Sequence, residues 1–384
     1  MRPMHVAVLF EFPSLNGGER SMLCALERLS SQSPIRFTAI APPEGALADR
    51  LNDMAVTLAP LRFRSDAGAK RDVTALLLEL SQILDDLRPD VVHANSLAMS
   101  RFLGRISGDL PRSLSLTGHI RDIMKLSALG IRHLNHLDRI VAVSLAAKSI
   151  LVSQGLESDR CSVIHNGVDA NEFCRRPKPE ARAIVLPDLG PSARVLLNVG
   201  QICLRKGQLD LAKAVIGLLQ HREDVHLVLA GTRYSGKAES CAYEKAINDS
   251  FSLAGLAHHL HRVGLREDVP VWMNAADFLV HCAHQEPLGR VLLEAAASEL
   301  PIIATDVGGT QEILRDQKDA LLVPSGDIAA LSAALLTAMG DPAGCKLRAS
   351  NAAAVIDARF GITKAADSLE QFWLQAVKSR DNCG

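Results

Sequence analysis

The chain has 384 residues, of which 48% are apolar and 22% are charged, and its formal net charge is −1. This length is typical of two domains rather than one, and the apolar content is sufficient for two packed cores. A nearly neutral chain lacks the surplus of lysine and arginine with which nucleic-acid binders neutralise phosphates, so nucleic acid is disfavoured as a partner.

Short apolar runs alternate with helical patterns through the first half of the chain. The first run, Val6–Phe10, is too short for a signal-peptide core and predicts a buried strand. No apolar run approaches the roughly 20 residues that span a bilayer. Apolar residues spaced three and four apart predict helices at Glu19–Leu29, Ala69–Leu87 and Leu145–Gln154. Further strands are expected at Ile35–Ala41, Val91–Ala94, Ser113–Thr117, Arg139–Val143 and Ser162–His165.

The second half repeats this alternation after Asn171–Pro191, a polar, proline-rich stretch that we interpret as an interdomain linker. Strands are expected at Val195–Val199, Val225–Ala230, Phe278–His281, Pro301–Thr305 and Ala320–Val323. We therefore predict an α/β protein with two Rossmann-like, doubly wound parallel sheets, residues 1–170 and 192–362, that face each other across a cleft. An amphipathic last helix, about residues 363–384, is expected to pack back on the first domain.

The cysteine and histidine patterns favour neither a disulfide framework nor a metal site. Eight cysteines are scattered without a Cys-x-x-Cys pair, which is typical of buried thiols in a reducing compartment, so we expect a cytoplasmic protein. The pairs His133/His136 and His281/His284 have no carboxylate at helical spacing to complete a ligand set. We expect no metal and no bound cofactor.

Three loops at expected strand ends carry candidate ligand-binding residues. Gly17 and Gly18 precede a predicted helix, where glycine lets backbone N–H groups approach an anion, although such a turn is also common as plain structure. The pair Arg205-Lys206 follows Gly200 and suits a pyrophosphate, the alternative being an ordinary solvated basic pair. No Gly-x-Gly-x-x-Gly follows any strand, which disfavours a dehydrogenase.

The third loop contains the most informative pattern, in which Glu286 is followed eight positions later by Glu294. Glu294 lies on an otherwise apolar helix face, where a carboxylate is costly without a hydrogen-bonding partner, and the two hydroxyls of a ribose would provide one. The backbone amides at Leu288, Gly289 and Arg290 begin the same helix and suit phosphate or sugar oxygens.

Taken together in this order, these motifs resemble family 4 of the retaining glycosyltransferases, which have the GT-B fold. The resemblance covers nearly the whole chain. In the first half it rests on Gly17-Gly18-Glu19, His93, His119, Asp138–Ser144 and Asn166–Asp169. In the second half it rests on Gly200, Lys206-Gly207, Glu286 with Glu294, Gly308-Gly309-Thr310 with Glu312, Val323-Pro324 and Gly326-Asp327.

The resemblance implies a hexose transfer from a nucleotide diphosphate sugar, of UDP or GDP type, with retention of configuration and without a metal. Arg205 and Lys206 would hold the pyrophosphate, Glu294 the ribose, and Glu286 with the amides at Leu288–Arg290 the transferred sugar. Gly17 and Gly18 would line the phosphates from the first domain, and His119 would reach the hexose near its reacting carbon. The acceptor would be a saccharide, a lipid-linked sugar or a small molecule, as in polysaccharide biosynthesis.

Several positions depart from the family pattern. Gln201 stands where arginine is usual, and Arg205 is our candidate for the missing charge. Pro287-Leu288 replaces a common Gly-Phe, Asn95 replaces a frequent histidine, and Glu299 occupies a helix end where glycine is usual. Two alternatives stay open at this point: a nucleotide-sugar epimerase or hydrolase on the same fold, and a non-catalytic subunit that binds a nucleotide sugar.

Residues 101–136 form a basic segment that allows a peripheral membrane contact. It contains six cations and two acids, an excess of four positive charges, and Ile120–Leu134 adds five apolar residues: Ile123, Met124, Leu126, Leu129 and Ile131. Such a surface could rest on anionic lipids at the inner face of a membrane. The alternative, which we favour, is that the apolar residues pack in the core and the cations are solvated.

Overall fold

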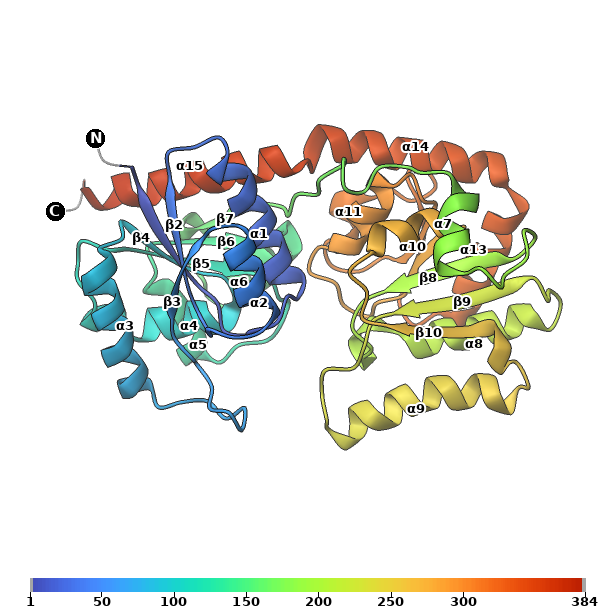
Figure 1. Ribbon diagram of the computed structural model, residues 1–384, viewed down its shortest axis with the longest axis horizontal. Coiled ribbons are helices and arrows are strands. Elements are labelled where there is room, and N and C mark those ends of the chain that lie inside the picture. Colours follow the sequence, from blue (N-terminus) through green and yellow to red (C-terminus); the bar gives the residue numbers. More distant parts are fainter. Residues whose placement is uncertain (1–2, 382–384) are drawn as a thin grey trace. The chain divides into compact units, whose positions relative to one another are not determined.

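The computed structural model describes residues 3–381, and the chain divides into two compact units (Figure 1). The first unit contains the chain up to Gly167 together with the segment that begins at Ile362, and the second is the continuous segment Val168–Gly361. The expected last helix is present as α15 (Ile362–Asp381), and residues 382–384 of that expectation lie outside the described residues.

The first unit is a seven-stranded sheet in which every adjacent pair is parallel, with the order β3-β2-β1-β4-β5-β6-β7. Its strands are β1 (His5–Leu9), β2 (Arg36–Ala41), β3 (Thr57–Pro60), β4 (Val91–Ala94), β5 (Ser115–Ile120), β6 (Arg139–Ala142) and β7 (Cys161–Val163). Its other helices are α1 (Gly17–Ser30), α2 (Ala46–Asp53), α3 (Val73–Leu87), α4 (Leu97–Arg105), α5 (Ala128–Asn135) and α6 (Leu145–Ser153).

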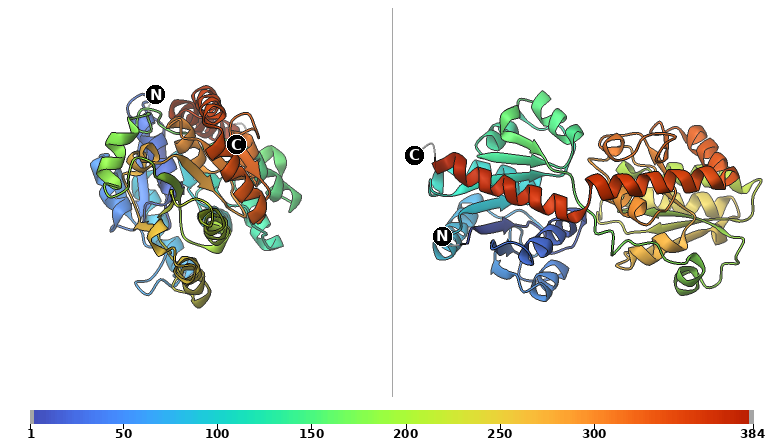
Figure 2. Two further views of the ribbon diagram at one scale, coloured as in Figure 1. Left: turned by 90° about the vertical axis from the view of Figure 1, so that its right-hand side faces the viewer. Right: turned by 90° about the horizontal axis from the view of Figure 1, so that it is seen from above.

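Alternation along the buried strands places helices on both faces of this sheet. Val6 and Val8 of β1 belong to a core with α1, α2 and α15, whereas Ala7 and Leu9 belong to a core with α3, α4, α5 and α6. Helix α15 runs alongside α1 and against β4 and β5, as the red ribbon shows in Figures 1 and 2. Its fully buried Trp373 donates from Nε1 to His93 Nδ1 at 3.2 Å, so the last helix is part of the first core.

The second unit has a six-stranded parallel sheet with the order β10-β9-β8-β11-β12-β13. Its strands are β8 (Arg194–Val199), β9 (Val225–Ala230), β10 (Leu260–Gly264), β11 (Phe278–His281), β12 (Ile302–Thr305) and β13 (Leu321–Val323). Its helices are α7 (Lys178–Val185), α8 (Gln208–Leu219), α9 (Ala238–Leu253), α10 (Val269–Ala275), α11 (Arg290–Ala297), α12 (Thr310–Ile313), α13 (Ile328–Gly340) and α14 (Pro342–Arg359).

The predicted fold class is confirmed for both units, because each is a doubly wound parallel sheet covered by helices. Strand order reverses between β1 and β4 and again between β8 and β11. Ligands of such sheets bind beyond the carboxyl ends of the strands at these reversals, so each unit has its own candidate edge.

Two expectations about the elements require correction. Strands β3 and β10 were not expected, because each is an outer strand with partly exposed residues and therefore lacks the apolar run of a central strand. The stretch 171–191 is not a simple linker, since it lies in the second unit and contains α7. Arg182 of α7 is buried, and its Nη2 donates a hydrogen bond to Asp277 Oδ2 at 2.5 Å. This bond anchors α7 to the second unit, and the polar composition of the stretch did not indicate it.

Among the described helices, none alone is both long and apolar enough to cross a membrane. Helices α13 and α14 together satisfy the length and composition criteria, but they meet at a bend of 102°.

Candidate functional site

In the second unit, glycines bring the loops after the central strands close together. Gly200 follows β8 and Gly231 follows β9, and a Cβ on Gly231 would lie only 1.9 Å from the carbonyl oxygen of Gly200. Gly207 adopts a left-handed φ of 67°, and a Cβ there would lie 1.9 Å from the carbonyl oxygen of Cys282. These contacts exclude any side chain, so the loop after β8 packs directly on the loop after β11.

This packing places Lys206 beside Glu286. The turn Leu204–Lys206 is fastened to the β11–α11 loop by a hydrogen bond from His284 N to Arg205 O of 2.8 Å. Lys206 forms an ion pair with the Glu286 carboxylate, and His281 Nε2 lies 3.0 Å from Glu286 Oε2. Glu286 is only 7% exposed, so its charge depends on these two neighbours.

Opposing effects set the charge of this cluster. Burial alone raises the pKa of Glu286, but the Lys206 charge and the His281 hydrogen bond together hold that pKa below its usual range. Burial, reinforced by the Lys206 charge, lowers the pKa of His281. The arrangement is therefore an anionic carboxylate between an ammonium and a neutral imidazole that donates from Nε2.

The loop that follows leads into α11 and contains the remaining second-unit candidates. Gly289 has a φ of 99° and caps the helix, and Leu288 before it is buried. Gly309 N donates to Glu286 O at 3.0 Å, and a Cβ on Gly309 would lie 2.4 Å from Pro287 O. The first amides of α11 thus begin next to Glu286, where helix N-termini favour anions.

Glu294 and Arg205 have partners that the sequence did not indicate. Glu294 Oε1 accepts a hydrogen bond from Arg290 Nε at 2.5 Å, one helical turn away, which satisfies the carboxylate that we expected a ribose to satisfy. Arg205 is exposed and donates from Nη1 to Gln285 O at 3.0 Å. Its guanidinium is consequently held at the backbone of the residue before Glu286, whereas Gln201 contributes a backbone acceptor to Gln208.

In the first unit, the guanidinium of Arg121 contacts several polar side chains at the carboxyl edge of the sheet. Its guanidinium donates to Asn166 Oδ1 at 2.8 Å and to Asn95 Oδ1 at 3.0 Å. Nη2 of Arg121, the atom that donates to Asn95, also lies 3.2 Å from Nδ1 of His119. His119 is only 4% exposed. Burial, followed by the charges of Arg121 and His93, lowers the pKa of His119 far below its usual value, so its imidazole is neutral.

Gly17 and Gly18 are the first two residues of α1 rather than a loop before it. A Cβ on Gly18 would lie 3.0 Å from Cδ of Arg121, so glycine at this position leaves room for the arginine side chain. A Cβ on Gly17 would meet open space. Glu19 Oε2 accepts from Asn16 N at 3.1 Å and caps the helix. Burial is the largest influence on Glu19 and raises its pKa.

The structure thus assembles two separate clusters from the predicted residues. Gly200, Arg205, Lys206, Glu286, Leu288, Gly289, Arg290 and Glu294 gather in the second unit, and Gly17, Gly18 and His119 gather in the first. Sequence reasoning missed Arg121 and His281 as members. The available signal was position, because Arg121 directly follows β5 and His281 ends β11.

The sequence disfavoured a metal site and indicated a basic segment at residues 101–136. Within residues 3–381, no group of three or more His, Cys, Asp or Glu side chains is arranged to hold a metal ion. In the basic segment, Ile123 and Ile131 are buried, while Met124 and Leu129 are 48% and 55% exposed. Arg121 belongs to the first-unit cluster, so only part of this segment is available as a charged apolar surface.

Comparisons with known proteins cover most of the chain. Residues 193–341 match the family described as "Glycosyl transferases group 1", and residues 15–172 match "Glycosyltransferase Family 4". A lipopolysaccharide core biosynthesis mannosyltransferase of Rhizobium meliloti is 28% identical over 210 residues, which are 54% of this chain and 59% of that protein. Glycogen synthase of Mycobacterium tuberculosis is 26% identical over 316 residues, 76% of this chain and 70% of that one.

One solved structure extends the likeness to nearly all residues. Anabaena HepE, crystallised in complex with UDP-glucose, matches with a TM-score of 0.83 and 21% identity, covering 97% of this chain and 100% of that chain. At this identity the likeness shows a shared fold.

Proposed function

Because this chain belongs to glycosyltransferase family 4, we propose that it transfers a hexose from a nucleoside diphosphate sugar, with retention of configuration and without a metal. The observation that carries the proposal is the second-unit cluster of Lys206, Glu286 and His281 beside the N-terminus of α11. It combines a cation for phosphate, a carboxylate for sugar hydroxyls, and backbone amides at the carboxyl edge of a parallel sheet.

In the proposed reaction the protein stabilises charge that develops on the leaving diphosphate. Lys206 and the exposed Arg205 supply positive charge, and the α11 amides supply hydrogen bonds. The glycosidic bond to phosphate breaks as the acceptor oxygen attacks the same face of the sugar, and the leaving phosphate takes the acceptor's proton. No side-chain nucleophile is required for this step.

Glu286 and Glu294 are assigned to binding rather than to proton transfer. The low pKa of Glu286 keeps it an acceptor, which suits hydroxyl groups of the transferred sugar. Glu294 would exchange part of its bond with Arg290 for the two hydroxyls of a ribose. Both assignments are supported by burial, since a nearly enclosed carboxylate is costly unless it accepts hydrogen bonds, which sugar hydroxyls can donate.

The first-unit cluster is assigned to sugar contact and to the phosphates. His119 holds its Nδ1 toward Arg121, which leaves the proton on Nε2 to donate to a sugar oxygen. In the described part of the chain, His119 Nε2 is buried and has no hydrogen-bond partner. Gly17 and Gly18 open the N-terminus of α1 to phosphate oxygens.

Relatives support the donor class more strongly than the acceptor. HepE was crystallised with UDP-glucose, and the Rhizobium relative is described as a mannosyltransferase of lipopolysaccharide core biosynthesis. We propose a UDP or GDP sugar as donor and a saccharide or lipid-linked acceptor of polysaccharide synthesis.

The full chain should first be screened by thermal shift against UDP, GDP and ADP sugars. A matching donor at 100 times its Kd should stabilise the protein by about 2.7 kcal/mol. Transfer to saccharide acceptors should then persist in excess chelator. Turnover of the donor without any acceptor would instead indicate an epimerase or hydrolase, and donor binding without turnover would indicate a non-catalytic subunit. Activity that requires added manganese or magnesium would contradict the metal-free mechanism.

We further propose that the enzyme works in the cytoplasm against an anionic membrane surface. The exposed Met124 and Leu129 lie beside the exposed Lys125 and Arg132, a combination that suits lipid headgroups. Seven free thiols among the described residues suit a reducing compartment. Co-sedimentation with vesicles should rise with anionic lipid, fall with salt, and weaken when Met124 and Leu129 are both changed to Ser. Failure to sediment at low salt would contradict the contact.

A further inference from the structure

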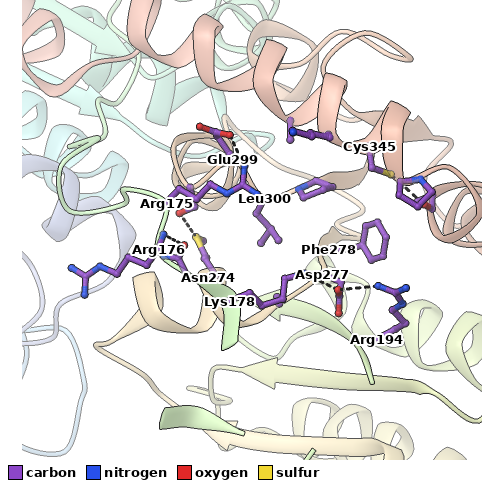
Figure 3. A pocket seen from close by; sticks show the side chains of 18 of the residues that line it. Arg175, Arg176, Lys178, Arg194, Asn274, Asp277, Phe278, Glu299, Leu300 and Cys345 are labelled. Atoms are coloured by element: carbon purple, nitrogen blue, oxygen red, sulfur yellow. Dashed lines mark hydrogen bonds and ion pairs between the residues drawn. The ribbon is translucent and has the colours of Figure 1, made fainter. Parts of the chain in front are cut away.

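The cavity of about 320 Å³ in Figure 3 is lined by residues at the starts of the second-unit strands. It therefore lies at the opposite edge of the sheet from the candidate donor site. Arg194 at the start of β8, Phe278 at the start of β11 and Pro301 before β12 all line it. The donor-site loops follow the other ends of these strands. Since β8 has 6 residues, the two edges are separated by roughly 20 Å at about 3.3 Å per residue.

The floor of this cavity is apolar. Phe278 and Leu300 are buried side chains that line it, and Met273, Met339 and Ala349 extend the same surface. The volume falls within the lower range of cavities that bind small molecules. An apolar ligand group of matching size could therefore be buried against this floor, out of contact with water.

Cations outnumber carboxylates at the rim. Buried Asp277 accepts from Lys178 at 2.8 Å, from Arg182 at 2.5 Å and from Arg194 at 3.5 Å, so one carboxylate faces three cations. Figure 3 shows Lys178 and Arg194 reaching Asp277 just below Phe278. Elsewhere on the rim, Arg175 pairs with Glu299 at 2.8 Å, and Lys346 adds a further positive charge. The residues that line the cavity include five cations and two carboxylates, an excess of three positive charges: Arg175, Arg176, Lys178, Arg194 and Lys346 against Asp277 and Glu299.

Several donors at this rim remain available to a ligand. Arg194 makes one contact at the limit of hydrogen bonding, and Lys178 uses one of its three protons. Lys346 is exposed at the rim, and within residues 3–381 no carboxylate lies within 4.0 Å of its ammonium. An anion bound between these groups would meet guanidinium and ammonium donors while its body lay on Phe278 and Leu300.

Glu299 at the rim has a strained backbone conformation. It follows α11 with a φ of 49°, a left-handed conformation that is unfavourable for a non-glycine residue. Its carboxylate holds Arg175 against the cavity. The strained residue thus places one of the two negative charges in an otherwise positive rim.

We propose that this cavity binds a phosphate monoester whose remaining part is a small alkyl or aryl group. An excess charge greater than one favours a phosphate dianion over a carboxylate, because arginine and lysine donors together match several phosphate oxygens. The apolar floor favours an ester over inorganic phosphate. The site is separate from the donor site and does not depend on the transfer reaction.

Isothermal titration calorimetry of the full chain with hexyl phosphate tests this site, with inorganic phosphate, hexanol and heptanoate as matched probes. Hexyl phosphate should bind tightest, and saturating UDP should leave its affinity unchanged. Arg194→Gln and Lys346→Gln should each weaken binding about tenfold, the usual effect of losing a hydrogen bond to a charged group. Lys213→Gln, an exposed charge change on α8, should have no effect.

Glu299→Gly supplies a variant of opposite sign, because it removes a carboxylate and releases Arg175, so hexyl phosphate should bind more tightly. Equal affinity for inorganic phosphate or hexanol would overturn the proposal. Displacement of hexyl phosphate by UDP would place it at the donor site and would equally overturn the proposal. Unchanged affinity in both Arg194→Gln and Lys346→Gln would show that it binds elsewhere.

Discussion

Each unit places a buried histidine at the carboxyl end of a central parallel strand, but the side chains that the two histidines contact carry opposite charges. His281 ends β11 and contacts the carboxylate of Glu286, which Lys206 neutralises. His119 lies near the end of β5 and contacts the guanidinium of Arg121. The fold therefore determines where each imidazole lies, whereas the residues just after the strand determine the charge that surrounds it.

This contrast divides the proposed chemistry between the units. In the second unit a fixed carboxylate accepts hydrogen bonds while an adjacent cation meets phosphate. In the first unit the guanidinium of Arg121 donates to the amide oxygens of Asn95 and Asn166, which carry no charge. Both histidines remain neutral because burial disfavours the imidazolium in either setting.

The largest expected effect breaks the second-unit cluster. Lys206→Ala should slow transfer by about 10²–10³-fold, because a preorganised positive charge is lost where the leaving phosphate develops its own. It should also lower the free energy of unfolding by roughly 3–5 kcal/mol, since Glu286 would stay buried without its partner. Urea unfolding and steady-state rates measure the two effects.

The double variant Lys206→Ala/Glu286→Gln separates these effects. It should recover most of the stability, because the buried charge is gone, but none of the activity. Lys213→Ala serves as the exposed control and should change stability by less than about 0.5 kcal/mol. A stable but inactive Lys206→Ala single variant would show that Glu286 does not need its ion pair for folding.

A pH titration tests the neutral histidines of the first unit. Burial, with a smaller effect from Arg121, lowers the pKa of His93 from 6.5 to about 3. The unfolded chain therefore binds a proton that the folded chain excludes, and stability falls as pH drops below 6.5. Between pH 7 and pH 5 this group alone should cost about 2 kcal/mol.

Trp373 provides the readout because it contacts His93, and a Trp272→Phe background removes the signal from the second unit. His93→Gln, which keeps an acceptor for Trp373 Nε1, should remove about 2 kcal/mol of the pH dependence. His221→Gln changes an exposed histidine of the second unit and serves as the matched control. A profile that is the same in all three proteins would contradict a buried neutral His93.

A conservative change sharpens the role of Arg121. Arg121→Lys keeps the charge but loses the fork that reaches Asn95 and Asn166 together, so transfer should fall about tenfold. The free energy of unfolding should fall by about 1 kcal/mol for the lost hydrogen bonds. Rates equal to those of the unchanged enzyme would show that only the charge at position 121 matters. The hydrogen bonds of Arg121 to Asn95 and Asn166 would then have no role in transfer.

The smallest expected effect concerns the strained end of α11. Glu299→Gly should relieve about 1 kcal/mol of left-handed strain and lose an exposed ion pair worth less than that. Unfolding should therefore require slightly more urea. Glu299→Ala loses the same pair but keeps the strain, so it should be the less stable of the two variants. The reverse order would contradict the left-handed strain, and a Glu299→Gly variant less stable than the unchanged protein would indicate that the pair with Arg175 outweighs the backbone cost.

The sequence by itself determined the two parallel sheets and most of the candidate site. Central strands such as β1 and β8 are buried on both faces, so they must be apolar runs, and such runs are visible in a linear sequence. The glycine turns and the pair Glu286/Glu294 were visible for a related reason. Close backbone approach and buried charge restrict which residues can occupy a position.

Only the tertiary structure decided which groups meet. The edge strands β3 and β10 are partly exposed, so no apolar run marked them. Glu286 and His281 are five residues apart, yet their partner Lys206 lies 80 positions away in the chain, and Arg121 reaches Asn166 across 45 positions. The rim of the cavity beside Phe278 likewise joins Lys178, Arg194 and Asp277 from separate elements. Such contacts depend on how strands order themselves in a sheet, because that order brings distant strand ends to one edge, and local periodicity does not encode it.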